Sequence, residues 1–274
     1  MLVAASVCPC PPLLVPEVAA GAAPELDAAR TACSDALAVL AAARPDRLVV
    51  VGPAEKAGRG LHPEGAPGSF RAFGVDVGVR LGRADAAASG TPVVPDAPDA
   101  QDASHASHAS HASHASHASH ASRVSSARDL PPSLAVGAWL LERAGWSAAP
   151  VGGLGVGEQL TTERCLEVGR EIGAASGRVA LLVMGDASAC RTLKAPGYLD
   201  ERAAPFDAEV ARALGTADVA ALGALDAELA YALKACGRAP WQVLAGAAEG
   251  AGLTGALLYE DAPYGVGYVV ATWS

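Results

Sequence analysis

Short apolar runs alternate with long helical patterns along most of this 274-residue chain. Each run has the length of a buried strand, and each helical pattern spans ten or more residues. The expected strands are Leu2–Val7, Leu48–Val51, Val75–Leu81, Val179–Met184, Ala256–Tyr259 and Gly267–Thr272. The expected helices are Pro24–Ala43, Ser133–Ala144, Thr161–Ala175, Pro205–Leu214, Val219–Cys236 and Pro240–Gly250. This alternation is typical of α/β domains, so we predict a mixed or largely parallel central sheet flanked by helices.

The alternation stops between residues 84 and 129, where the sequence is rich in Ala, Ser, Pro and Asp. Residues 104–122 repeat the triplet Ser-His-Ala and hold six of the seven histidines of the chain. Because such small side chains cannot bury a core, we predict a disordered insertion in a single domain made of residues 1–83 and 130–274. Flexible histidines at this spacing can chelate Ni, Cu or Zn, whereas a solvent-exposed product of triplet expansion needs no metal; both interpretations stay open.

The chain is acidic, with a formal net charge of −9 and a pI of about 5.2. Nucleic acids and anionic membrane surfaces require a concentrated basic face, so neither is expected as a partner. No run approaches the roughly 18 apolar residues of a membrane span, and the N-terminal segment lacks the basic start of a signal peptide. Six cysteines in a long chain without such a signal indicate reduced thiols and a cytoplasmic location.

One strand ends in a sequence that predicts a ligand site. The apolar run Leu181–Met184 breaks at Gly185-Asp186 and continues into small polar residues. In open α/β folds the carboxyl ends of strands border a crevice where ligands bind. We therefore take Asp186 and Ser188 as candidate catalytic residues, with the alternative that the Asp186 carboxylate only accepts hydrogen bonds from the backbone of its turn.

Three motifs in the second half of the chain occur together in one order: Gly185-Asp186, Cys-Gly-Arg-x-Pro at 236–240, and Pro-Tyr-Gly-Val-Gly-Tyr at 263–268. With them the chain resembles the superfamily of the catalytic B-type subunits of class III extradiol ring-cleavage dioxygenases, which includes the Memo proteins. The resemblance runs from Val7 to Trp273, apart from the histidine repeat.

This resemblance implies an extradiol dioxygenase B-subunit-like fold and a metal-dependent oxidoreductase that acts on aromatic diols. Active relatives hold a non-haem Fe(II) on two histidines and a carboxylate, which leaves positions open for a catecholate and O₂. A further histidine moves protons on the substrate hydroxyl, and Memo-type members use a cysteine as the third ligand. Relatives often form dimers or larger assemblies, so a homo-oligomer is expected.

The metal-ligand positions of the resembling motifs are occupied by other residue types here. In active relatives the first histidine ligand follows a proline, and Cys10 occupies that position here. Glu55 or Lys56 occupies the position of the second histidine ligand. Cys236 matches the Memo-type ligand, next to Ala235, where some relatives carry Glu. We predict a metal site of Cys10, Glu55 and Cys236, which suits Zn or Cu(I) better than Fe(II). The alternative is that both cysteines are small buried hydrophobic residues.

The histidine that transfers protons in active relatives is replaced by Ala189, and a Glu-His pair of the family appears as Pro131-Pro132. Outside the repeat the chain has a single histidine, His62. Two hypotheses follow. The chain is an extradiol dioxygenase-type oxidoreductase using a metal on an aromatic small molecule, or it is a non-catalytic pseudoenzyme without a cofactor that keeps the cleft for small-molecule or protein binding.

Overall fold

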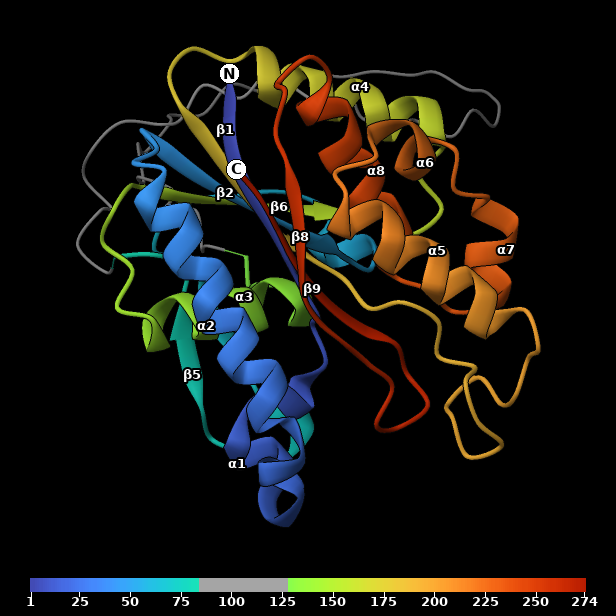
Figure 1. The fold of residues 1–274 in the computed structure, drawn as a ribbon. Helices are drawn as coiled ribbons and strands as arrows, with labels where there is room; N and C mark the ends of the chain where they lie inside the picture. The colour runs from blue at the N-terminus through green and yellow to red at the C-terminus, as the bar shows by residue number, and fades with distance from the viewer. Residues whose placement is uncertain (84–127) are drawn as a thin grey trace, which may run out of the picture.

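The computed structural model describes residues 1–83 and 128–274. The predicted disordered insertion, with its histidine repeat, lies almost entirely outside these residues. A seven-stranded sheet runs through the middle of the molecule and draws strands from both described parts of the chain (Figure 1). In chain order its strands are β1 (Leu2–Cys8), β2 (Arg47–Pro53), β3 (Gly60–His62), β6 (Val151–Val156), β7 (Val179–Met184), β8 (Gly255–Asp261) and β9 (Tyr268–Trp273).

The spatial order of the strands is β3-β6-β2-β7-β1-β9-β8. The four strands β6, β2, β7 and β1 are parallel to one another, while β3, β9 and β8 pair antiparallel at the two sides. The predicted mixed or largely parallel sheet is therefore present. All six residues of β7 are buried, which is why its sequence reads as one continuous apolar run.

Helices cover both faces of the sheet (Figure 1). The helices of the described residues are α1 (Pro16–Ala19), α2 (Asp27–Ala42), α3 (Pro132–Arg143), α4 (Thr162–Ala174), α5 (Ala203–Gly215), α6 (Val219–Gly223), α7 (Ala227–Ala232) and α8 (Arg238–Ala248). Successive side chains of a strand point to opposite faces, so β7 contributes to two cores. Leu182 and Met184 belong to the core with α2 and α3, whereas Leu181 and Val183 belong to the core with α4, α5 and α8.

The expected elements differ from the structure in several places. The strand expected at Val75–Leu81 is shorter, and it forms a separate hairpin, β4 (Pro67–Ser69) with β5 (Gly78–Arg80). Strand β6 was missing from the expected strands because three of its six residues are glycines, which carry no apolar side chain for a pattern to detect. The helix expected over Val219–Cys236 is divided into α6 and α7, because the Asp226 carboxylate accepts hydrogen bonds from two amides of α7 and starts a new helix there.

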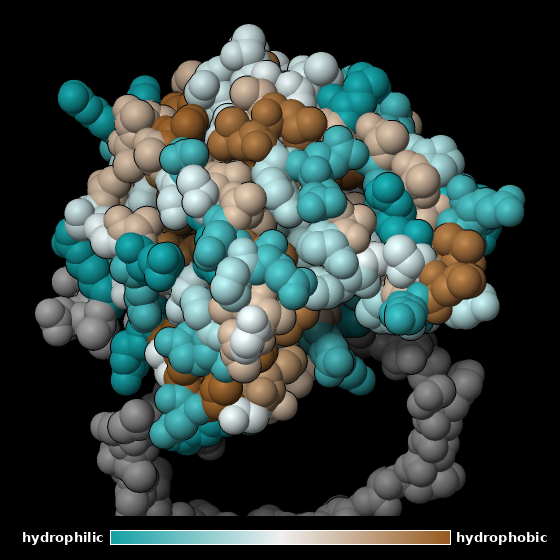
Figure 2. Space-filling view, turned by 60° about the horizontal axis from the view of Figure 1, so that its bottom comes forward, coloured by the Kyte–Doolittle hydropathy of each residue, from teal (hydrophilic) through white to brown (hydrophobic). Residues whose placement is uncertain are grey.

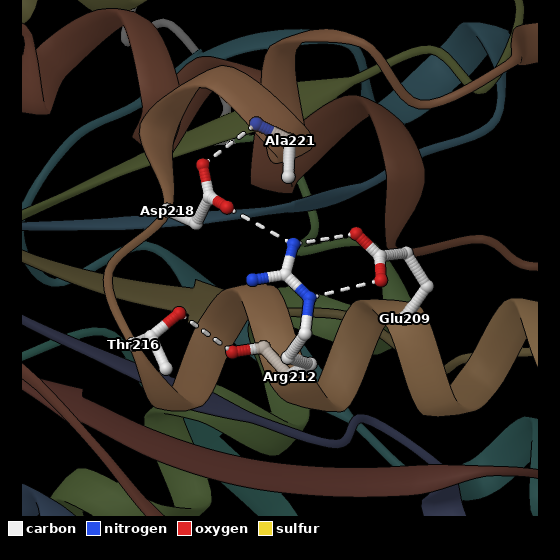
Figure 3. Close-up of polar contacts among 5 residues, drawn as sticks. All are labelled: Glu209, Arg212, Thr216, Asp218 and Ala221. Carbon is white, nitrogen blue, oxygen red and sulfur yellow. Dashed lines mark hydrogen bonds and ion pairs between the residues drawn. The ribbon is translucent and has the colours of Figure 1, made fainter.

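A surface cluster joins α5 to the start of α6 (Figure 3). The Arg212 guanidinium donates to both carboxylate oxygens of Glu209 at 2.9 and 2.6 Å, and to Asp218 at 2.9 Å. The other Asp218 oxygen accepts from the Ala221 amide at 3.0 Å and so caps α6. These contacts lower the pKa of Asp218, with the amide hydrogen bond as the largest cause. The cluster explains how α6 follows α5 so closely.

Within the described residues, no helix combines the length and the apolar character needed to cross a membrane. All six cysteines lie in this part of the chain and are free thiols.

Candidate metal centre

The carboxyl ends of β1 and β7 bring two distant loops together. The strands are parallel neighbours in which Cys8 pairs with Met184, and the Gly185 amide donates to the Cys8 carbonyl at 3.0 Å. Cys10 and Asp186 each lie two residues beyond this last pair, so they meet at the same end of the sheet. The Cys10 amide donates to the Asp186 carboxylate at 2.8 Å.

A third residue reaches this point from the loop before α8. The backbones of Gly185 and Gly237 lie so close that a Cβ atom on Gly185 would collide with the Cα atom of Gly237, and a Cβ atom on Gly237 would collide with the Trp241 ring. This approach places Cys236 beside Asp186: the Asp186 amide donates to Cys236 Sγ at 3.4 Å, and the Gly237 amide donates to the Asp186 carbonyl at 2.9 Å. Glycine is needed at position 185 because the strand end touches the start of α8 there, and at position 237 because the Trp241 side chain fills the space beside it.

The ligand atoms of Cys10, Asp186 and Cys236 all lie within 4.8 Å of one another. We call these three residues the Cys-Asp-Cys cluster. Cys10 is 7% exposed, whereas Asp186 and Cys236 are half-buried, so the cluster is open on one side. Two thiols and a carboxyl at such separations need only small side-chain movements to bind one Zn²⁺, whose bonds to sulfur and oxygen are about 2.0–2.3 Å long.

Burial shifts the acid–base behaviour of the cluster. It raises the pKa of Asp186 to about 7, while the hydrogen bond from the Cys10 amide acts in the opposite direction. The pKa of Cys10 is raised well above its ordinary value, first by hydrogen bonding with the Cys236 thiol, then by burial and by the nearby Asp186 charge. Burial and the same carboxylate raise the pKa of Tyr268, at the start of β9. A cation bound by the cluster would replace the protons retained by Asp186 and Cys10, because metal ligands bind in their deprotonated forms.

Glu55, the third ligand expected from the sequence, is not in the cluster. It is exposed in the loop after β2, as is its neighbour Lys56. Strand β2 is separated from β1 by β7 in the sheet, so the residues that follow β7 are nearer to Cys10. Asp186 therefore occupies the position that we assigned to Glu55, and it does so as a ligand candidate rather than only as a catalytic or turn residue.

Ser188, the second catalytic candidate, is fully buried and already paired. Its amide and hydroxyl both donate to the Asp207 carboxylate at 2.8 Å, and Arg191 donates to the same carboxylate at 3.0 Å. The hydroxyl is thus used to anchor the loop after β7 on α5. Asp207 was missed by sequence reasoning because its position inside a helical pattern gave no signal of this contact.

Neither of the two remaining positions of interest, Ala189 and His62, brings an acid–base group to the cluster. Ala189 is buried, and its amide donates to the Leu233 carbonyl at 2.9 Å. His62, the only histidine among the described residues, is buried in β3, where its Nε2 lies 2.9 Å from the Gly58 carbonyl oxygen. It is not part of the Cys-Asp-Cys cluster.

The donors of the cluster do not fit the iron expected from the resemblance. Non-haem Fe(II) oxygenases use two imidazoles and one carboxylate, and the described residues supply two thiols and one carboxyl instead. Thiolates favour Zn²⁺ and Cu(I), so the chemistry of the cluster differs from that of a ring-cleaving centre.

Figure 2 turns the lower end of the molecule in Figure 1 toward the viewer, the end at which β1 and β7 finish. Apolar side chains form separate small areas there among hydrophilic ones. Leu193, Tyr198 and Leu199 in the loop after β7 are among the exposed large hydrophobic side chains.

No protein-family model matches the chain, and no curated protein sequence matches it. Among solved structures, the crystal structure of the uncharacterized protein JW3007 from Escherichia coli K12 aligns with a TM-score of 0.49 and 14% sequence identity, covering 99% of this chain and 100% of that chain. Similarity at this level assigns neither a family nor an activity, so the function has to be argued from the cluster itself.

Proposed function

We propose that this protein is a zinc-binding relative of the extradiol dioxygenase B-subunit-like superfamily, with Cys10, Asp186 and Cys236 as the ligands. The observation that carries the proposal is the convergence of two thiols and a carboxyl within 4.8 Å at the carboxyl end of a parallel sheet. This is also the end of the sheet at which α/β folds bind ligands.

Zinc fits this set of donors better than the other candidates. Two sulfur ligands disfavour Fe(II), and the carboxylate, a hard oxygen donor, favours Zn²⁺ over Cu(I). Three protein ligands leave the fourth tetrahedral position open, which is the arrangement of catalytic rather than structural zinc sites. The half-buried side of the cluster gives a water molecule or a small ligand access to that position.

We propose ligand binding at the cluster without ring cleavage. The described residues place no histidine at the cluster to move a proton on a diol hydroxyl, and Ala189 has no acid–base group. We propose that the carboxyl end of the sheet beside the cluster binds a small molecule, with an aromatic diol as the class implied by the resemblance. The substrate chemistry of iron-dependent relatives is not part of the proposal.

Cobalt substitution tests the zinc site in the full chain. Co²⁺ replaces Zn²⁺ in thiolate sites and gives a sulfur-to-cobalt charge-transfer band that imidazole ligands do not produce, so the histidine repeat does not contribute to it. We expect the band to saturate at one Co²⁺ per chain and to disappear when Zn²⁺ is added. Cys10→Ser and Cys236→Ser should each weaken the band strongly. Cys190→Ser is the matched control, since a serine there can keep the hydrogen bond to the Leu233 carbonyl.

Two results would overturn the proposal. One is the absence of the charge-transfer band when Co²⁺ is added to folded, metal-stripped protein. The other is stoichiometric iron together with oxygen uptake on catechol or protocatechuate, which would restore the ring-cleavage hypothesis.

A further inference from the structure

Cys10 and Cys236 are two free thiols from opposite ends of the chain whose sulfur atoms lie within 4.8 Å. Both belong to loops: Cys10 follows β1, and Cys236 lies between α7 and α8. A disulfide requires the two sulfurs to come to about 2.05 Å, with Cβ atoms about 3.5–4.5 Å apart. Side-chain rotation and a small loop movement are enough to close the remaining distance.

The two thiols differ in exposure. Cys236 is half-buried, whereas Cys10 is buried and only 7% exposed. A small oxidant arriving from solvent therefore reaches Cys236 first. Cys10 is then positioned as the resolving thiol, which is the arrangement found at redox-sensitive cysteines.

We infer that Cys10 and Cys236 are a reversible oxidation site for hydroperoxides, and that the disulfide they form switches metal binding off. The regulatory consequence rests on the proposed zinc function, because a disulfide removes both sulfur ligands from the metal. The disulfide itself depends only on the two thiols.

The reaction balances with the hydroperoxide as the only oxidant. The Cys236 sulfur takes the terminal oxygen of ROOH as a hydroxyl group, the O–O bond breaks, and the proton lost by the thiol leaves with RO⁻ as ROH. The Cys10 sulfur then attacks Cys236–SOH. The S–S bond forms, the S–O bond breaks, and the hydroxyl group leaves with the Cys10 proton as water. Overall, two thiols and ROOH give a disulfide, ROH and water.

A second pair of cysteines provides an internal control. Cys33 raises the pKa of Cys8, with a thiol–thiol hydrogen bond as the largest cause, so these side chains are also neighbours. Both are fully buried in the core between the sheet and α2. An oxidant has no direct access to them, so they should remain reduced while Cys10 and Cys236 react.

Peptide mapping of the native full chain tests the inference. Metal-stripped protein is treated with hydrogen peroxide, the free thiols are alkylated, and the unfolded chain is digested with trypsin without reduction. Cleavage after Lys and Arg gives peptides 1–30, 31–47 and 235–238, which contain Cys8 with Cys10, Cys33, and Cys236 respectively. We expect peptide 1–30 joined to 235–238, with the loss of two hydrogen atoms, and its disappearance on reduction with dithiothreitol.

Variants assign the bond to individual residues. Cys8→Ala should retain the joined peptide, whereas Cys10→Ser and Cys236→Ser should each lose it. Since Cys236 is half-buried, its substitution is a test even if a change at the buried Cys10 disturbs folding. Joining of 1–30 to 31–47 alone, or oxidation of Cys236 only to sulfinic acid, would overturn the inference.

The cobalt band separates this inference from the proposed zinc site. Loss of the band on peroxide treatment, and its return on reduction, would support both. A joined peptide in a chain that never gives the band would support the dithiol and contradict the zinc proposal. A band that persists through peroxide treatment, with no joined peptide, would support the zinc site and overturn the oxidation site.

Discussion

Two carboxyl groups at the loop after β7, the half-buried Asp186 and the buried Asp207, have opposite surroundings. The Asp207 carboxylate accepts three hydrogen bonds, from the amide and the hydroxyl of Ser188 and from Arg191. The Asp186 carboxylate accepts one, from the Cys10 amide, among the described residues. Burial raises the pKa of both, but only Asp207 has a cation and several donors that offset this effect.

This contrast distinguishes a structural carboxylate from a ligand candidate. The charge of the Asp207 carboxylate is already balanced by Arg191 and by two donors from Ser188, so it stabilises the fold and gains little from a bound cation. An under-partnered carboxyl beside two thiols keeps free lone pairs, and its burial is costly until a cation binds. The sequence suggested Ser188 as a catalytic residue, whereas its hydrogen bonds to Asp207 give it a structural role.

Removing the partnered carboxylate should have the largest effect on stability. Asp207→Ala leaves the buried Ser188 amide and hydroxyl without their acceptor, so we expect a loss of about 3 kcal/mol in the free energy of unfolding. Urea denaturation measures this loss. Asp200→Ala is the control, because its ion pair with Arg202 is largely solvated and should contribute much less to stability. Equal losses in the two variants would contradict the structural role of Asp207.

Replacing the under-partnered carboxyl should do the opposite. Asp186 has a folded-state pKa of about 7, above its ordinary value of 3.8, so the folded state retains a proton that the unfolded state releases. Stability is therefore lost as the pH rises from about 4 to 7. In the presence of a chelator at pH 8, Asp186→Asn should be more stable than the wild type by about 2 kcal/mol, since its amide oxygen can still accept from Cys10.

Urea denaturation at pH 5 and pH 8 checks the Asp186→Asn prediction, with the difference shrinking at the lower pH. The pKa of Asp200 is lowered to about 2, mainly by the Arg202 side chain, so Asp200→Asn should show no such dependence over this range. Parallel curves for the wild type and Asp186→Asn would show that Asp186 is not under-partnered in solution.

Ser188→Ala should have a smaller effect. It removes the hydroxyl hydrogen bond to Asp207 but leaves the bonds from the Ser188 amide and from Arg191, so we expect a loss of about 1 kcal/mol. The cobalt band should be unchanged. If Ser188→Ala had near-normal stability but a weaker cobalt band, Ser188 would have a role in the functional site.

The smallest effect is expected for the exposed network of Arg212 with Glu209 and Asp218. Because solvent screens these charges, Arg212→Ala should change the urea denaturation curve very little. The small loss of stability should shrink at high salt, whereas the loss for Asp207→Ala should not. If the loss for Arg212→Ala were as large as that for Asp207→Ala and independent of salt, burial would not be the property that separates Asp207 from the exposed carboxylates Glu209 and Asp218.

Much of the fold could be predicted from local patterns. Strands β1, β2, β7, β8 and β9 and the helices α2, α3, α4, α5 and α8 lie close to their expected positions, because each has a clear apolar periodicity or buried run. The glycine-rich β6 and the break before α7 were missed, since one depends on neighbouring strands and the other on a single capping residue. Homo-oligomer formation and binding of an aromatic ligand stay predictions.

The candidate site was only partly predictable, for a physical reason. The chain carries thiols at 10 and 236 and an Asp after its most buried strand, and these identities come directly from the sequence. Which carboxyl joins the thiols depends on the strand order, a long-range property: β7 rather than β2 is the neighbour of β1, so Asp186 lies in the cluster and Glu55 is in solvent. The contact between Gly185 and Gly237, made only when α8 packs on the sheet, then brings Cys236 within reach.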